Sequence, residues 1–249
     1  WSGIFRAAAV VFFAFIGFDA VSTAAQEAKN PQKNMPIGIL GSLIVCTVLY
    51  VAFSHVMTGL ANYKEFAGSA APVAIAIAKT PYVWLQQLII LAILAGYSSV
   101  ILVMLMGQSR VFFSMSKDGL LPRIFSEVHP TFRTPWKSNL MFMVFVSLFA
   151  AFVPVTVVGE MTSIGTLFAF ILVCIGVLVM RRTMPNVPRA FKTPLVPLVP
   201  ILGIVTCLAM MASLPLDTWV RLIVWMLIGV IIYFVYSRKH SVLTSKQTV

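Results

Sequence analysis

The sequence predicts an all-α integral membrane protein with seven transmembrane helices, and three observations support this fold class. Of the 249 residues, 60% are hydrophobic and only 10% are charged, and the mean hydropathy is +0.98. A soluble domain carries about 25% charged residues, so this composition argues against a soluble fold. The apolar residues form seven stretches long enough to cross a bilayer. The basic residues gather in alternate connections between these stretches.

Each predicted helix takes one apolar stretch, in chain order. The first stretch, residues 7–26, is uncharged apart from Asp19, the second is uncharged, and the third opens with Pro81 and is uncharged as far as Ser109. The fourth follows a long polar segment, and the fifth comes almost directly after it. The sixth has prolines at its start, which predict a late or kinked beginning, and the seventh is apolar except for Arg221. We expect the helices at about 7–28, 36–59, 82–115, 138–158, 160–180, 194–214 and 218–237.

The distribution of charge predicts the orientation in the membrane. With the 27–35 connection placed in the cytoplasm, 14 of the 18 basic residues lie in cytoplasmic segments. Cytoplasmic connections are enriched in Lys and Arg, so the first span runs inward and the C-terminus is cytoplasmic. The net charge of +11 is therefore a topology signal, and no nucleic-acid partner is expected.

Other site classes have little support in the sequence. The three cysteines lie in apolar runs, at spacings that predict neither a zinc site nor a disulfide framework. The sequence contains no HExxH, GxSxG, Walker A or GxGxxG element, so we expect neither an enzyme nor a bound metal or cofactor. The chain begins with Trp and has no signal-peptide pattern, and with an odd number of spans it resembles the C-terminal part of a longer protein.

The first span carries a glycine and an acid in the segment Ile16-Gly17-Phe18-Asp19. An acid at mid-membrane depth costs about 2.5–3.5 kcal/mol, so it needs compensation or a bound proton. One interpretation is a broken helix whose free carbonyls face a polar ligand, with Asp19 at the start of the inner half. The other is a continuous helix with a packing glycine and an acid bonded to a neighbouring helix.

A second polar feature is the pair Ser98-Ser99 in the third span. Adjacent hydroxyls at this depth can coordinate a sodium ion or hold a water molecule. Alternatively, each hydroxyl can donate back to a carbonyl of its own helix. The residues themselves leave both interpretations open.

Two long motifs resemble a known family. They are FFAFIGFDAVSTAAQEAKNPQKNMPIGI, residues 12–39, and GQSRVFFSMSKDGLLPRIFSEVHPTFRTPWKSN, residues 107–139. Both resemble the amino acid–polyamine–organocation transporters, within them the cationic amino acid transporter branch and its bacterial relatives. The resemblance covers the whole chain as helices six to twelve. It implies the leucine-transporter-type inverted-repeat fold: residues 1–180 form the second repeat, with its first helix broken. Residues 181–249 add two helices and a cytoplasmic tail.

The resemblance also implies roles for individual residues. The carbonyls of Phe13, Ala14 and Ile16 would bind the α-amino group of the substrate, the Phe13 ring would cover it, and Gly17 would permit the break. Asp19 would act in gating or proton coupling, Ser98 and Ser99 would lie beside an ion site, and Leu102 and Val103 would face the substrate side chain.

The expected function is proton-coupled symport of a neutral amino acid by alternating access, in a bacterial cell membrane. The alternatives are a cationic amino acid transporter or exchanger and, from another class, a non-transporting amino acid sensor. The first repeat, which this chain lacks, would be its structural partner, so the chain alone is not expected to transport.

Overall fold

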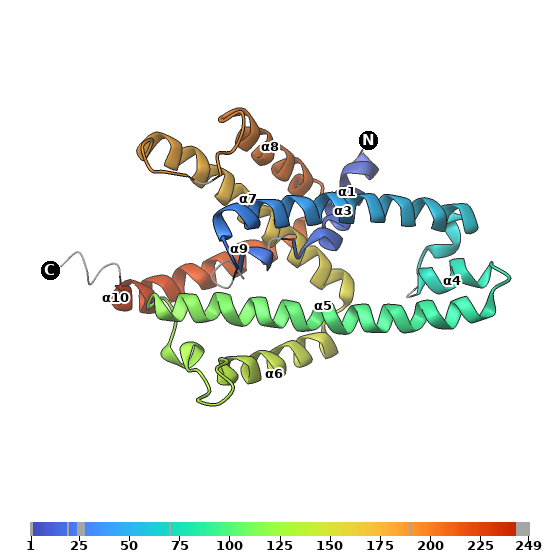
Figure 1. The fold of residues 1–249 in the computed structure, drawn as a ribbon, viewed down its shortest axis with the longest axis horizontal. Helices are drawn as coiled ribbons and strands as arrows, with labels where there is room; N and C mark the ends of the chain where they lie inside the picture. Colours follow the sequence, from blue (N-terminus) through green and yellow to red (C-terminus); the bar gives the residue numbers. More distant parts are fainter. Residues whose placement is uncertain (1, 19, 24–27, 70, 190, 243–249) are drawn as a thin grey trace.

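The computed structural model describes residues 2–18, 20–23, 28–69, 71–189 and 191–242, and all regular elements in these ranges are helical (Figure 1). Seven apolar helices correspond to the predicted spans: α1 (Ser2–Phe15), α3 (Pro31–Leu60), α5 (Val83–Lys117), α6 (Trp136–Phe152), α7 (Val155–Thr183), α8 (Leu198–Ala212) and α9 (Leu216–Ile232). The short elements are α2 (Ala20–Thr23), η1 (Tyr63–Phe66), α4 (Pro72–Ala78), η2 (Arg123–Ser126), η3 (Tyr233–Ser237) and α10 (Arg238–His240).

Four of these helical segments are long and apolar enough to cross a membrane. They are α3, α5, α7 and the continuous segment Leu216–His240, which joins α9 to η3 and α10. The apolar helices α1, α6 and α8 are shorter. The predicted all-α membrane class is confirmed at this level.

Several helix boundaries differ from the sequence prediction, and prolines explain two of the differences. We expected the fourth span to reach residue 158, but α6 ends at Phe152 and α7 begins at Val155. Pro154 explains the difference, because a proline disfavours helical geometry in the residue before it and is itself tolerated at a helix start. The sixth span begins later than residue 194, at Leu198, directly after Pro197, and Pro200 lies in its first turn.

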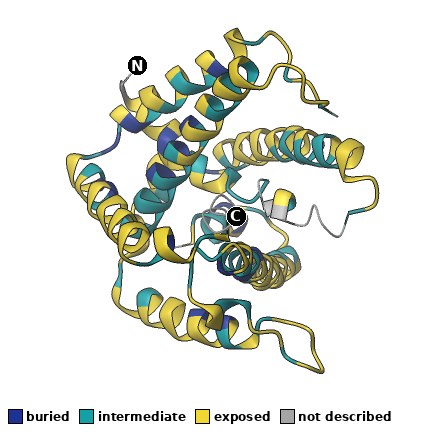
Figure 2. Ribbon diagram, turned by 90° about the vertical axis from the view of Figure 1, so that its left-hand side faces the viewer, coloured by how far each residue is buried: buried dark blue, intermediate teal, exposed yellow. Residues whose placement is uncertain are grey.

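The buried core lies where α1, α7, α8 and α9 meet. Ala9 of α1, Leu167 of α7, Met211 of α8 and Leu222 of α9 belong to one buried cluster, and Leu167 is completely inaccessible. By contrast, α3 contains no buried residue, and the most apolar stretch of α5 is also unburied. Figure 2 shows this contrast between the dark buried turns and the exposed surfaces.

The connection between α3 and α5 is closed by an ion pair. Lys79 Nζ lies 2.8 Å from Glu65 Oε2, which joins the end of α4 to η1. The Lys79 ammonium donates a hydrogen bond to this carboxylate and its positive charge stabilises the ionised form, so it holds the pKa of Glu65 below its ordinary value. This pairing folds the connection back on itself between the two long helices.

The C-terminal end of α5 has the glycine cap that the sequence predicts. Gly119 has a φ of 78°, and its amide donates to Ser116 O at 3.1 Å. The amide of Leu120 donates to Met115 O at 2.8 Å, which completes a Schellman motif. Pro122 follows, and the helix cannot continue.

The end of the described chain packs on this cap. Ser237 Oγ donates to Leu120 O at 2.7 Å, and the amide of Val242 donates to Asp118 O at 3.0 Å. A Cβ atom added to Gly119 would lie only 2.0 Å from His240 O. We call this set of contacts the C-terminal docking contact. It joins the end of the last span to the connection that follows α5.

Candidate functional site

The first span is interrupted between its two helical parts. α1 ends at Phe15, Ile16 to Phe18 form a turn, and α2 begins at Ala20. Gly17 has a φ of 130°, which L-residues with a side chain rarely adopt. Asp19 lies outside the described residues. The backbone therefore has the interruption that one of the two sequence interpretations requires.

The interruption exposes the carbonyls at the end of α1. The last carbonyls of a helix have no partner within that helix and must find other donors. Phe13 O accepts a hydrogen bond from the amide of Ile16 at 3.2 Å. Ala14 O accepts one from the Tyr50 hydroxyl of α3 at 2.8 Å. Each carbonyl oxygen has two lone pairs and can in general accept two donors.

Aromatic rings surround the interruption. Phe170 of α7 contacts Phe12 of α1 and Phe18 of the turn, with ring centroids 5.9 and 5.6 Å apart. On α3, the Tyr50 ring meets Phe15 edge-on at 5.0 Å. These contacts place apolar surface beside polar main-chain acceptors, which is the usual composition of a small-molecule site. The Phe13 side chain itself is 47% exposed.

Helix α5 approaches the interruption through Met104. A Cβ atom added to Gly17 would lie 2.9 Å from Met104 Cε. Leu102 instead lines a groove of 820 Å³ between α5 and α6. Residues two positions apart on a helix point about 200° apart, so Leu102 and Met104 occupy opposite faces of α5. Val103 is 47% exposed, and the substrate-facing roles of Leu102 and Val103 stay predictions.

The two serines of α5 donate to their own helix. Ser98 Oγ donates to Leu94 O at 2.9 Å, and Ser99 Oγ donates to Gly96 O at 2.8 Å. This is the alternative arrangement that the sequence left open. Each hydroxyl oxygen can still accept or coordinate, so a role beside an ion site stays a prediction.

Three residues at the interruption were absent from the sequence prediction: Tyr50, Met104 and Phe170. Tyr50 was the one with a usable signal, because a tyrosine hydroxyl within a membrane span is too far from its own backbone to bond locally and needs a partner elsewhere. Met104 and Phe170 are ordinary apolar residues in apolar helices, and only the packing of the helices identifies them.

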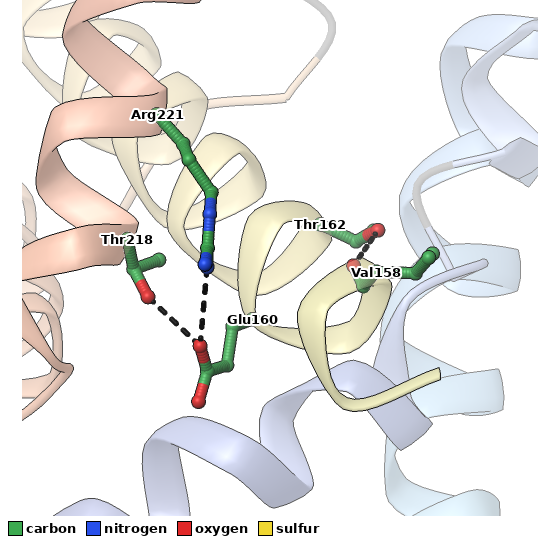
Figure 3. Close-up of polar contacts among 5 residues, drawn as sticks. All are labelled: Val158, Glu160, Thr162, Thr218 and Arg221. Carbon is green, nitrogen blue, oxygen red and sulfur yellow. Dashed lines mark hydrogen bonds and ion pairs between the residues drawn. The ribbon is translucent and has the colours of Figure 1, made fainter. Parts of the chain in front are cut away.

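A separate polar cluster connects α7 to α9 (Figure 3). Thr218, which is fully buried, donates from Oγ1 to Glu160 Oε2 at 2.9 Å. Arg221 Nη1 lies 3.6 Å from the same oxygen. The sequence placed Arg221 near one end of a span but did not predict its partners.

Replacing Glu160 tests the strength of this cluster. We expect Glu160→Ala to lower the free energy of unfolding by about 1–2 kcal/mol, because the buried Thr218 hydroxyl loses its acceptor. The midpoint of thermal unfolding in detergent measures the change. Glu127→Ala is the matched control: Glu127 pairs with Lys137 at half-exposed positions, where an ion pair contributes little. Equal stability of the Glu160 variant and wild type would contradict this role.

Comparison with known proteins identifies the family. The family model described as amino acid permease matches residues 1–235. The chain is 48% identical over 241 residues to the branched-chain amino acid permease BcaP of Bacillus subtilis, covering 97% of the chain and 52% of that protein. It is 42% identical to the methylthioribose transporter of the same organism, with the same coverage. The vacuolar cationic amino acid transporter 4 of Arabidopsis thaliana is 37% identical over 185 residues, covering 74% of the chain and 31% of that protein.

These relatives are permeases and transporters rather than enzymes, and they agree with the family that the two sequence motifs predicted. The chain spans about half the length of the bacterial relatives that it matches. Together with its apolar helices, the match over nearly the whole chain shows a membrane protein that belongs to the amino acid permease family.

Proposed function

We propose that the protein is a secondary active transporter that moves a neutral amino acid by alternating access, in symport with protons. The observation that carries this proposal is the interruption of the first span, where the carbonyls of Phe13 and Ala14 lie beside aromatic rings. Main-chain acceptors suit an ammonium group, and transporters commonly bind substrates at such broken helices. The adjoining rings suit an apolar side chain.

The substrate class follows from the side chains around the interruption. Phe15, Phe18, Met104 and Phe170 are apolar, which favours a branched or otherwise aliphatic amino acid over a cationic one. The name of the Bacillus subtilis relative BcaP agrees with this preference. Cationic amino acids are the second candidate, because the names of the plant relatives refer to them.

Uptake into proteoliposomes tests the proposal. The protein, together with the region that precedes this part in its relatives, is reconstituted and supplied with radiolabelled leucine, lysine or methylthioribose. We expect leucine to accumulate and an inward proton gradient to increase its initial rate. If lysine is taken up in preference to leucine, the substrate is a cationic amino acid and the neutral class is wrong. Leucine that binds but is never taken up would identify a sensor instead.

Asp19 provides a direct test of proton coupling. We expect Asp19→Asn to abolish the stimulation of uptake by the proton gradient, because an amide does not take up and release a proton in this pH range. Exchange of leucine for leucine, which needs no net proton movement, should persist. Initial rates with and without the gradient measure both. Gradient-stimulated uptake at the wild-type level would contradict the role of Asp19.

We further propose that the protein lies in the cell membrane with its C-terminus in the cytoplasm. The enrichment of basic residues in alternate connections supports this orientation. The segment ahead of this part would supply the first inverted repeat of the transporter.

A further inference from the structure

We infer that Tyr50 is a positioning residue for the substrate amine, a role that rests on the proposed transport function. The hydroxyl of Tyr50 reaches from the middle of α3 to the interrupted end of α1, where it donates to Ala14 O at 2.8 Å. Ala14 is one of the residues whose carbonyls would bind the amine according to the family resemblance. The contact therefore acts directly on a predicted substrate ligand.

The Tyr50 hydrogen bond supplies a donor to a carbonyl at the interrupted end of α1. A main-chain carbonyl without a donor is costly in a bilayer, where water is scarce. The amide of Ile16 meets the neighbouring acceptor, Phe13 O, within the turn itself. Ala14 O receives its donor from another helix instead. The direction in which the Ala14 carbonyl points therefore depends on the position of α3 as well as on the conformation of the turn.

The Tyr50 ring is held independently of its hydroxyl. It packs edge-on against Phe15, with an interplanar angle of 81° and a centroid distance of 5.0 Å. An edge-to-face pair of this kind is a favourable geometry for two aromatic rings. Removing the hydroxyl alone should leave the ring in place, so the two contributions can be separated by mutation.

Helix α3 also contacts the other half of the interrupted span. A Cβ atom added to Gly38 would lie 3.8 Å from Val21 Cγ1 of α2. Gly38 and Tyr50 are twelve residues apart on one helix, which is about 18 Å along its axis. α3 therefore runs alongside the interruption and contacts the chain on both sides of it. Tyr50 makes a polar contact between α3 and α1, the first part of the interrupted span.

Tyr50→Phe in the full-length protein tests the inference. We expect the KM for leucine uptake to rise about fivefold, in line with the loss of one hydrogen bond, with kcat changed less than twofold. The inhibition constant of 4-methylpentanoate, which is leucine without its α-amino group, should not change. The preference for leucine over this analogue then falls about fivefold. Tyr233→Phe is the matched control, because Tyr233 lies 48% exposed on the last span.

Two outcomes would overturn the role of Tyr50. A wild-type KM in the Phe variant would show that the hydroxyl does not position the site. An equal weakening of leucine and 4-methylpentanoate would show a general structural effect without any specific action on the amine. If the wild-type protein transports no leucine, the proposed function fails. In that case calorimetry measures the binding of leucine and 4-methylpentanoate to the solubilised protein and to its Phe variant. Weaker binding of leucine alone in the variant supports the role of Tyr50, and unchanged binding contradicts it.

Discussion

Replacement of Gly17 by alanine is expected to reduce leucine uptake at least tenfold while the protein still inserts into the membrane. The φ of 130° at this position is in a region that alanine strongly disfavours, and holding it there costs about 1–3 kcal/mol. The new Cβ would also lie 2.9 Å from Met104 Cε. The backbone would relax toward a helical conformation and redirect the carbonyls at the end of α1. Initial rates of uptake at equal protein density measure the loss.

A second variant separates the backbone effect from the steric one. Met104 ends in a flexible methyl group, so Met104→Ala should provide space for the added Cβ but leave the φ requirement unchanged. We therefore expect Gly17→Ala with Met104→Ala to stay impaired. Gly41→Ala is the control, because a Cβ there meets no atom within 4 Å. Recovery of uptake in the double variant would show that crowding, and not backbone conformation, explains the requirement for glycine.

Replacement of Gly119 by alanine is expected to have the largest effect on stability. The residue has a φ of 78°, and an added Cβ would lie 2.0 Å from the main-chain oxygen of His240. A rigid main-chain atom cannot move aside as a side chain can. The C-terminal docking contact must separate, and the bonds that Ser237 and Val242 donate are lost with it. We expect the free energy of unfolding to fall by about 2–4 kcal/mol.

Gly68 provides a matched control for this variant. Its φ of 77° is nearly the same, but a Cβ there meets no atom within 4 Å. Gly68→Ala should therefore lower the free energy of unfolding only by the cost of a positive φ for alanine, about 1 kcal/mol. Thermal unfolding in detergent compares the two, and cross-linking of cysteines placed at 118 and 242 reports docking directly. Equal destabilisation by both variants, with cross-linking retained, would show that the docking contact does not depend on Gly119.

Much of the fold could be predicted because it depends on local sequence. Seven apolar stretches gave seven apolar helices, and the glycine cap of α5 follows from the order of Gly119 and Pro122. The boundary at Pro154 was missed although the residue that causes it was visible, because the apolar pattern continues through it. The sequence also indicated the two alternatives for Ser98 and Ser99, which are an ion or water site and hydrogen bonds within their own helix. Only the structure showed that both hydroxyls donate to their own helix.

The contacts that could not be predicted join residues far apart in the chain. Thr218 meets Glu160 across 58 positions, and Tyr50 meets Ala14 across 36. Each contact depends on how one helix is rotated and shifted against another. Hydrophobic periodicity does not determine this in a span that is apolar on all sides. The same limit applies to Leu102, which lines the groove beside α6, and its substrate-facing role stays a prediction.

The acceptors at the end of α1 belong to the main chain, and this has a consequence for how specificity evolves. Substitutions at Phe13 or Ala14 change the side chain but retain the carbonyl oxygen, so the acceptor that we propose for the substrate amine persists through most substitutions. Changes in the side chains around it, such as Phe170 and Met104, should instead alter which amino acid the proposed site accepts. A random screen for loss of amine recognition should therefore recover proline substitutions and changes at Gly17 far more often than changes elsewhere in the turn.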